Sequence, residues 1–397
     1  MKKNVIFIVA LVLASSLSMR AMTEREALVA IYKALNGPEW EADDAKGWNT
    51  NAPIKEWKNV TTDATGEHVE ALQLRADEIK GYLPAAIGEL KSLKYLKLRY
   101  KDREADAAQC IPAEVWTLPE LVDIDVYIAG KGTYTLPKEI KCPKLNTIKV
   151  NKLQGPFDVL LTLPKLVEVC FEDVNGDMPE NIGELTKLRR LTWKSGNDPT
   201  KRIPASLGKC SMMESLILDN STFTKAHVGN IEFPAEVWDL TNLKYLFLRN
   251  IADKPSTIPA DKVAKMTRLE NVILCRVSLE GNIPAEFFTT GNMKQFDVYE
   301  NFVTGSIPKE LGNCIKLTTV QLNNNNLTGS IPEELGNCPK LRNLNLSKNP
   351  DLGGKVPESF VNCPDLAIFK VDGTQVDSNV SDPLKAHPKF SRWKFNK

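Results

Sequence analysis

Four carboxylates are the residues in this chain whose type and spacing could support chemistry. Asp123 and Asp125 are separated by one residue, and Glu168 and Glu172 follow further along the chain. Paired carboxylates can act as general acid and base or bind calcium. On a strand whose residues alternate between two faces, such carboxylates are more typical of the solvated polar face. An enzyme that uses them is therefore the least favoured of three functional hypotheses.

The histidines and cysteines add little material for a catalytic or metal site. The chain has eight cysteines and three histidines, and His68, His227 and His387 are far apart in the sequence. No C-x-x-C pair, H-E-x-x-H, G-x-S-x-G, Walker loop or dinucleotide-binding fingerprint occurs. We therefore expect no catalytic residues, no metal and no cofactor.

The overall charge argues against one class of partner. Lys and Arg total 51 and Asp and Glu total 50, so the formal net charge of the 397-residue chain is +1. This balance gives no electrostatic reason to expect a nucleic acid partner. Charged residues make up 25% and hydrophobic residues 42%, which is ordinary for a soluble folded protein.

The first residues have the order of an export signal. Lys2 and Lys3 precede an apolar run over residues 5–13, and small residues follow at 14–18. This order predicts a cleaved signal peptide at residues 1–21, of a kind that suggests a bacterial source. No later segment approaches the roughly 18 apolar residues of a membrane span. We expect a secreted, cell-surface or periplasmic protein with no membrane span after cleavage.

A repeat with two linked markers organises the rest of the sequence. The segments 317–325 and 341–349 share the pattern L-x-x-L-x-L-x-x-N. The L-x-x-L-x-L part, with other apolar residues allowed, starts at Val69, Leu93, Leu121, Leu145, Leu166, Leu188, Met213, Leu243, Leu269, Met293, Leu317, Leu341 and Leu366. An apolar-Pro pair follows in most units, at Pro84, Pro112, Pro137, Pro179, Pro204, Pro234, Pro259, Pro284, Pro308, Pro332 and Pro357. Two periodic markers in step indicate a repeat protein.

The combined pattern L-x-x-L-x-L-x-x-N-x-L-x-G-x-I-P resembles the leucine-rich repeat family. Its L-x-G-x-I-P element resembles the plant-type subclass, which is also found in exported bacterial surface proteins. The resemblance covers nearly all of residues 24–397 and is most regular over 281–357. Residues 145–165 lack the apolar-Pro pair and are either a repeat or an irregular insertion. The resemblance implies a scaffold for recognition rather than catalysis.

Elementary geometry gives the same architecture, an α/β solenoid of about thirteen repeats. Each L-x-x-L-x-L segment is a short strand with alternate residues inward, and stacked copies form a parallel sheet. Short helices or irregular turns on the other side need more room, so the stack curves with its sheet on the concave face. Asn325 and Asn349 are expected to form hydrogen bonds with buried backbone groups. The glycines Gly281, Gly305, Gly329 and Gly354 permit unusual backbone angles, and the prolines suit the first position of a helical turn.

Atypical segments are expected at both ends, because an open solenoid end exposes its core. The helical N-terminal cap at 22–68 has a capping box, Thr23-x-x-Glu26, at the start of a helix over 24–36. Trp40, Trp48 and Trp57 are predicted to cover the first repeat. The repeats fill 69–371, and the C-terminal cap at 372–397 contributes Phe390, Trp393 and Phe395.

Most cysteines occupy a position that holds leucine or methionine in other repeats. Cys142, Cys210, Cys314, Cys338 and Cys363 each stand three residues before a strand start. We expect them to be buried free thiols, although stacked neighbours could also lie within disulfide range. Cys170 differs, because it alternates with core residues and should face the concave surface.

The concave face is the predicted site of function. We expect a macromolecular partner, most favourably a protein, to contact Tyr95, Lys97, Arg99, Tyr127, Arg189, Arg190, Tyr245, Phe247, Arg249 and Tyr299. Tyr and Arg are frequent in binding hot spots, and the sign of charge changes from repeat to repeat along this face. An exposed Phe247 between Tyr245 and Arg249 favours a binding surface over a merely solvated one. A glycan that stacks on Tyr, Phe or Trp remains the second hypothesis.

Overall fold

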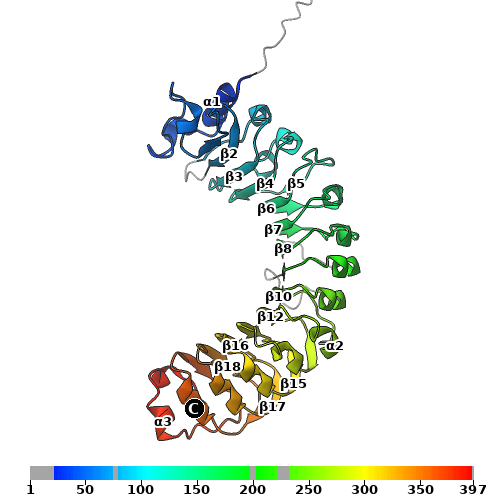
Figure 1. Cartoon of the computed structure of the whole chain (residues 1–397), viewed down its shortest axis with the longest axis vertical. Coiled ribbons are helices and arrows are strands. Elements are labelled where there is room, and N and C mark those ends of the chain that lie inside the picture. Colours follow the sequence, from blue (N-terminus) through cyan, green and yellow to red (C-terminus); the bar gives the residue numbers. More distant parts are fainter. Residues whose placement is uncertain (1–21, 75–78, 197–202, 221–231, 396–397) are drawn as a thin grey trace, which may run out of the picture.

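The computed structural model describes residues 22–74, 79–196, 203–220 and 232–395. The predicted signal peptide and His227 lie outside these residues. Successive turns of the chain are stacked into an arc, with strands along its inner side and short helices along its outer side (Figure 1). No helix among the described residues is long and apolar enough to cross a membrane.

The inner side of the arc is one long sheet whose consecutive strands pair in parallel. After each pattern start in the described residues the chain forms a strand, and buried positions alternate with more exposed ones in most of these strands. These strands are β2 (Val69–Leu74), β3 (Tyr95–Tyr100), β4 (Asp123–Ile128), β6 (Thr147–Gln154), β7 (Glu168–Asn175), β8 (Arg190–Ser195), β9 (Ser215–Asp219), β10 (Tyr245–Arg249), β12 (Asn271–Cys275), β14 (Gln295–Asp297), β16 (Thr319–Gln321), β18 (Asn343–Asn345) and β20 (Ile368–Lys370). Strand β1 (Val60–Thr62) pairs antiparallel with β2, and β5 (Tyr134–Thr135) pairs with β6.

The outer side consists mainly of single turns of 3₁₀ helix. They include η3 (Ala85–Glu89), η5 (Ala113–Thr117), η6 (Asp158–Thr162), η7 (Ile182–Glu184), η8 (Ala205–Lys209), η10 (Ala235–Asp239), η11 (Ala285–Phe288), η12 (Lys309–Asn313), η13 (Glu333–Asn337) and η14 (Glu358–Asn362), with the short α-helix α2 (Ala260–Val263) among them. The prediction for the prolines was off by one position. Pro84 precedes the first helical residue in an extended conformation, and its carbonyl accepts a hydrogen bond from the Ile87 amide at 3.1 Å.

A second parallel sheet, which no sequence pattern predicted, lies in the C-terminal half. Its strands are β11 (Ser256–Thr257), β13 (Leu279–Asn282), β15 (Phe302–Ser306), β17 (Asn326–Ser330) and β19 (Asp351–Gly353). The L-x-G segments form most of these strands. Gly305 and Gly329 have φ angles of +73° and +76°, which residues with a side chain rarely adopt. The most regular repeats therefore carry two sheets rather than one.

Buried asparagines hold the turns that follow the strands, as predicted. Asn325 donates hydrogen bonds from Nδ2 to the carbonyls of Val298 at 2.6 Å and Leu322 at 3.0 Å. Its Oδ1 accepts from the Val303 amide at 3.1 Å. Asn349 repeats this arrangement one turn later. It donates to the carbonyls of Leu322 and Leu346 and accepts from the amide of Leu327. Each asparagine thus satisfies backbone groups of its own repeat and of the preceding one.

The segment at 145–165, which the sequence allowed to be either a repeat or an irregular insertion, is a repeat. It contributes β6 to the main sheet in register with both neighbours, and η6 on the outer side. Phe157 takes part in its core and packs against Phe171 and Trp193. The missing apolar-Pro pair therefore changes the outer turn but not the stacking.

At the N-terminus a short helix and a set of tryptophans cover β2. Helix α1 (Glu24–Ala34) starts with the predicted capping box but ends two residues earlier than predicted, before Asn36 in a left-handed conformation. Trp40, Trp48 and Trp57 are buried. The rings pack in series, with Trp48 5.4 Å from Trp40 and 5.2 Å from Trp57. Their burial favours the packing role over an exposed sugar platform.

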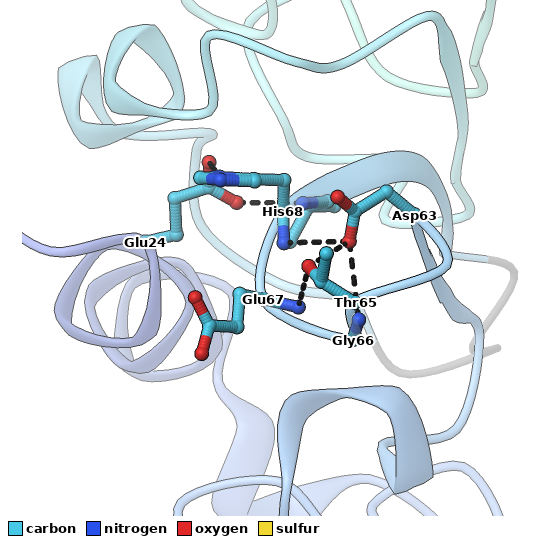
Figure 2. A network of polar contacts seen from close by, with 7 residues as sticks. Glu24, Asp63, Thr65, Gly66, Glu67 and His68 are labelled. Carbon is cyan, nitrogen blue, oxygen red and sulfur yellow. Dashed lines mark hydrogen bonds and ion pairs between the residues drawn. The ribbon is translucent and has the colours of Figure 1, made fainter.

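A polar network ties α1 to the turn before β2 (Figure 2). Glu24 accepts a hydrogen bond from the Val69 amide at 2.6 Å and contacts Nδ1 of His68 at 3.2 Å. Asp63 accepts from the hydroxyl of Thr65 at 2.7 Å and from backbone amides of the same turn, including that of His68 at 3.3 Å. At this end of the solenoid the carboxylate of Glu24 therefore contacts the imidazole of His68, a group that can gain or lose a proton.

We expect the N-terminal end to be more stable in mild acid. The hydrogen bond to Glu24 raises the pKa of His68 above its ordinary value of 6.5. The contribution is fully present below that ordinary value and is lost as pH rises through the raised pKa. The melting temperature of the wild type minus that of His68→Gln should be larger at about pH 5.5 than at about pH 8.5. Equal differences at the two pH values would contradict this.

At the other end, aromatic side chains cover the last strand as predicted. Trp393 packs 5.2 Å from Phe369 of β20, and its Nε1 donates to the Leu366 carbonyl at 3.0 Å. Phe390 and Phe395 pack around the same rings. The helices α3 (Asp382–Lys385) and η15 (Phe390–Arg392) carry the chain across this end.

Candidate binding surface

Strand register aligns one outward-facing residue from each strand into a middle row along the concave face. In order the row holds Gln73, Lys97, Asp125, Lys149, Cys170, Thr192, Ile217, Phe247, Ile273, Asp297, Gln321, Asn345 and Lys370. The row is charged over β3–β6, largely apolar over β7–β12 and amide-rich over β16–β18. We call Cys170, Thr192, Ile217, Phe247 and Ile273 the apolar floor.

The predicted contact residues all lie on this face, in two groups. Tyr95, Lys97 and Arg99 are on β3 beside Tyr127 on β4. The second group contains Phe247 of the apolar floor and residues beside the floor, namely Arg189, Arg190, Tyr245, Arg249 and Tyr299. Tyr95 and Tyr127 are the most open of these aromatic residues, with 48% and 45% of their surface exposed. The ten residues were predicted to form one surface, whereas they lie in two groups on different strands of the face.

Most of the charges on this face are paired with one another across neighbouring strands. Among the residues that the structure describes, we find three places where one carboxylate is shared by two cations. Asp125 contacts Lys97 at 3.2 Å and Arg99 at 2.7 Å, Glu168 contacts Lys149 at 2.9 Å and Arg190 at 2.6 Å, and Glu214 contacts Arg189 at 2.7 Å and Lys244 at 3.0 Å. We call these the three triads. Further ion pairs join Lys94 to Glu70, Lys194 to Glu172, Arg249 to Asp219, Arg276 to Glu300 and Lys294 to Glu270.

The cations hold the triad carboxylates in their ionised form. Burial alone would raise the pKa of Asp125 and of Glu168, but the hydrogen bonds from their basic partners outweigh burial and lower both. Hydrogen bonds from Lys244 and Arg189 lower the pKa of Glu214. Burial raises the pKa of Asp123, which forms no ion pair among the described residues. Of the four carboxylates that could support chemistry, three are thus engaged by Lys or Arg.

Phe247 is half-buried rather than exposed, which corrects the prediction. The guanidinium of Arg249 lies over its ring, 5.2 Å from the centroid. Arg249 is itself fixed by Asp219, with Nε to Oδ1 at 2.9 Å and Nη2 to Oδ2 at 2.7 Å. A bidentate pair of this kind holds the guanidinium in one orientation. The ring is therefore a supported part of the floor and presents only a portion of its surface.

Asp297 belongs to the middle row but is only 2% exposed. Its Oδ2 accepts hydrogen bonds from Gln295 at 2.6 Å and Gln321 at 3.1 Å, whereas Oδ1 has no partner among the described residues. Burial raises the pKa of Asp297 and also that of Tyr299 close by. This end of the floor is closed by side chains.

The structure also contains a groove that no sequence pattern indicated. It has a volume of about 590 Å³ and runs beside the C-terminal halves of β4, β6, β7 and β8. Its lining comprises Arg103, Tyr127, Ile128, Ala129, Asn151, Lys152, Glu172, Asp173, Lys194 and Ser195. Because five separate repeats contribute to it, no local spacing in the sequence could predict it. The groove extends the accessible surface beyond the middle row.

All eight cysteines are free, and seven of them are buried, which confirms the leucine-replacement interpretation for most of the repeats. Cys170 is the half-buried exception, on the apolar floor. Burial raises the pKa of its thiol, and the nearby Glu172 adds to the effect. The described residues contain no cluster of His, Cys, Asp or Glu that could hold a metal ion.

Cys170 should be the first thiol labelled by a maleimide under native conditions. Because the thiolate is the reactive form and its pKa is raised, labelling should be slow near neutral pH and faster in mild alkali. Peptide mass spectrometry after a time course would identify the modified residue. The variant Cys170→Ser should take up little label, and labelling of fully buried Cys338 at the same rate would refute the assignment.

Comparison with known proteins agrees with this geometry. The model of the family described as Leucine Rich Repeat matches residues 316–338. No curated protein matches the chain in sequence. The solved structures similar to it include the Arabidopsis receptor kinase HAESA in complex with the peptide hormone IDA and the co-receptor SERK1, at 22% identity and a TM-score of 0.65, covering 89% of this chain and 54% of that one.

Two further structures show the same fold. A TDR receptor is 20% identical with a TM-score of 0.62, covering 80% of this chain and 53% of that one. An internalin (inlF) from Listeria monocytogenes is 17% identical with a TM-score of 0.54, covering 84% of this chain and 91% of that one. The chain thus spans about half the length of the two receptors. At these identities the likeness concerns the fold.

The repeated strand, the buried asparagine and the curved parallel sheet define the class as a leucine-rich repeat solenoid. Residues 316–338 match the leucine-rich repeat family model, and the chain has the leucine-rich repeat fold.

Proposed function

We propose that this chain binds a protein or peptide partner through its concave face and has no enzymatic activity. The observation that carries the proposal is the apolar floor bordered by paired charges. An apolar centre with a polar rim is the usual arrangement of a protein interface. The HAESA structure, with a peptide hormone bound, supports this choice of ligand class.

The engaged carboxylates support a binding function over an enzymatic one. Asp125, Glu168 and Glu172 each contact a cation on a neighbouring strand. A general acid or base needs a pKa near the operating pH and must be free to exchange a proton with the substrate. The lowered pKa values of Asp125 and Glu168 argue against that role at neutral pH.

A glycan is the second candidate, and the exposed rings of Tyr95 and Tyr127 favour it. Both lie at the N-terminal end of the face, away from the floor. Sugar rings stack on open aromatic faces, and the floor offers little of this because Arg249 covers Phe247. A glycan ligand would therefore depend on Tyr95 and Tyr127, and replacing both by alanine would abolish its binding.

The test compares a floor variant with a matched outer variant. Ile217→Lys places a charge in the middle of the floor, and its flexible side chain can reach solvent without unfolding the repeat. Lys309→Glu changes an exposed residue of η12 on the outer side. A partner captured from surface extracts should bind Ile217→Lys at least about tenfold more weakly than wild type, whereas Lys309→Glu should bind unchanged. The opposite pattern would place the interface on the outer side.

Export is part of the same proposal. The order of charged, apolar and small residues over 1–18 supports cleavage of a signal peptide. The mass of the protein recovered from its source should correspond to a chain that starts close to residue 22. Recovery of the chain with its first residues intact would contradict export by this route.

A further inference from the structure

We infer that the partner presents an acidic, extended segment to the strands β3–β10 of the concave face. The inference rests on the proposed function and specifies its ligand. It comes from the triads, in which each carboxylate is shared by two cations. One carboxylate neutralises only one of them, so each triad carries one surplus positive charge.

The surplus charges belong to this part of the face and not to the chain as a whole. Other ion pairs on the same face match one cation with one carboxylate, for example Lys194 with Glu172 and Lys294 with Glu270. The net charge of the whole chain is +1. The triads therefore mark a local preference for anions, of the kind that orients a partner at short range.

The triads are evenly spaced along the solenoid. Asp125 lies on β4, Glu168 on β7 and Glu214 directly before β9, with β6 and β8 between them. Two strand steps of about 4.8 Å put neighbouring triads about 10 Å apart. A peptide in the extended polyproline II conformation rises about 3.1 Å per residue and has three residues per turn. Acidic residues at every third position would therefore lie on one side of the peptide, about 10 Å apart, and would meet successive triads.

The residues between the triads favour a peptide over an anionic polysaccharide. Cys170, Thr192 and Ile217 of the apolar floor lie on β7, β8 and β9, alongside the second and third triads. Apolar side chains between the acidic ones would fill this space, and a polysaccharide has none. Asp123 lies beside Tyr95 on the neighbouring strand and adds a negative charge near Lys97 of the first triad and Lys149 of the second. That charge opposes a densely charged polyanion but tolerates spaced carboxylates.

The experiment uses synthetic probes, because the natural partner is not identified. A fluorescein-labelled peptide of about 15 residues would carry Glu at every third position with Val and Ser between, and binding would be followed by anisotropy. Matched peptides would carry Gln in place of Glu, or Glu at every second position. Heparin would serve as the polysaccharide probe. All variants would be checked for an unchanged melting profile.

Substitutions within a triad should act in opposite directions. Removing surplus cations in Arg190→Gln/Lys244→Gln should weaken binding of the spaced acidic peptide about tenfold, whereas removing the shared carboxylate in Glu168→Gln should strengthen it about threefold. Lys309→Gln on the outer side is the matched control and should change nothing. The spaced peptide should also bind more tightly than either matched peptide, and more weakly at high salt.

Three results would overturn the inference. They are equal binding of the Glu and Gln peptides, no effect of the Arg190→Gln/Lys244→Gln change, and tighter binding of heparin than of the spaced peptide. These are separable from failure of the proposed function. If the natural partner is lost in Ile217→Lys but unaffected by the triad variants, the proposed function stands and the acidic ligand is wrong.

Discussion

Replacing Asn325 by alanine should lower the free energy of unfolding by about 3 kcal/mol, because it leaves several buried backbone groups without partners. The side chain donates to the carbonyls of Val298 and Leu322 and accepts from the amide of Val303. Asn325 is only 4% exposed, so water cannot replace these bonds. The loss should destabilise the repeat that contains Asn325 and the one before it together.

The neighbouring residue provides the control for this experiment. Asn326 is exposed, and Asn326→Ala should change the free energy of unfolding by no more than about 0.5 kcal/mol. Both variants would be compared with wild type by urea denaturation at a fixed pH. An effect of Asn325→Ala as small as that of Asn326→Ala would show that the turn does not depend on its asparagine.

Removing the ring of Trp193 should be at least as costly, with Trp193→Ala lowering the free energy of unfolding by about 3–5 kcal/mol. Trp193 is almost fully buried and packs 4.9 Å from Phe157 and 5.6 Å from Phe171. Its indole Nε1 has no hydrogen-bond partner among the described residues. The side chain therefore stabilises the fold by packing alone.

That unpaired nitrogen makes a second substitution informative. Trp193→Phe keeps an aromatic ring and removes a buried donor that makes no hydrogen bond, so it should cost only about 1 kcal/mol. Denaturant unfolding of the two variants measures the difference. A Trp193→Phe variant as unstable as Trp193→Ala would mean that the indole nitrogen makes a bond essential to the fold.

The parts of the fold that could be predicted from sequence are those in which the requirements of one position, such as burial or an unusual backbone angle, determine the residue found there. A buried asparagine after a strand, as at Asn325, and a glycine at positive φ, as at Gly329, each have a local cause that recurs in every regular repeat. The pattern of alternate leucines fixes which face of each strand is buried. Repetition then converts these local rules into a solenoid.

The pairing of charges could not be predicted in the same way. Arg190 bonds Glu168 across 22 residues, Arg99 bonds Asp125 across 26, and Lys244 bonds Glu214 across 30. These separations vary because the repeats differ in length on their outer side, while strand register alone decides which side chains meet. The sequence therefore showed alternating charges on the concave face but not that they neutralise one another.

The exposure of individual side chains also depended on neighbours from other repeats. Phe247 is covered by Arg249, which is oriented by Asp219 one strand away. Asp297 is enclosed together with Gln321 of the following repeat. A position that alternates with core residues is on the concave side, but the size of adjacent side chains decides whether a ligand can reach it.

The free cysteines have a consequence for where this protein can fold. No covalent cross-link joins any two repeats, since all eight thiols are unpaired. Its native state contains no bond that a reductant can break, so its stability should not depend on the redox state of its surroundings. The solenoid can therefore form without an oxidant or a disulfide isomerase, and it would remain folded when moved between oxidising and reducing compartments.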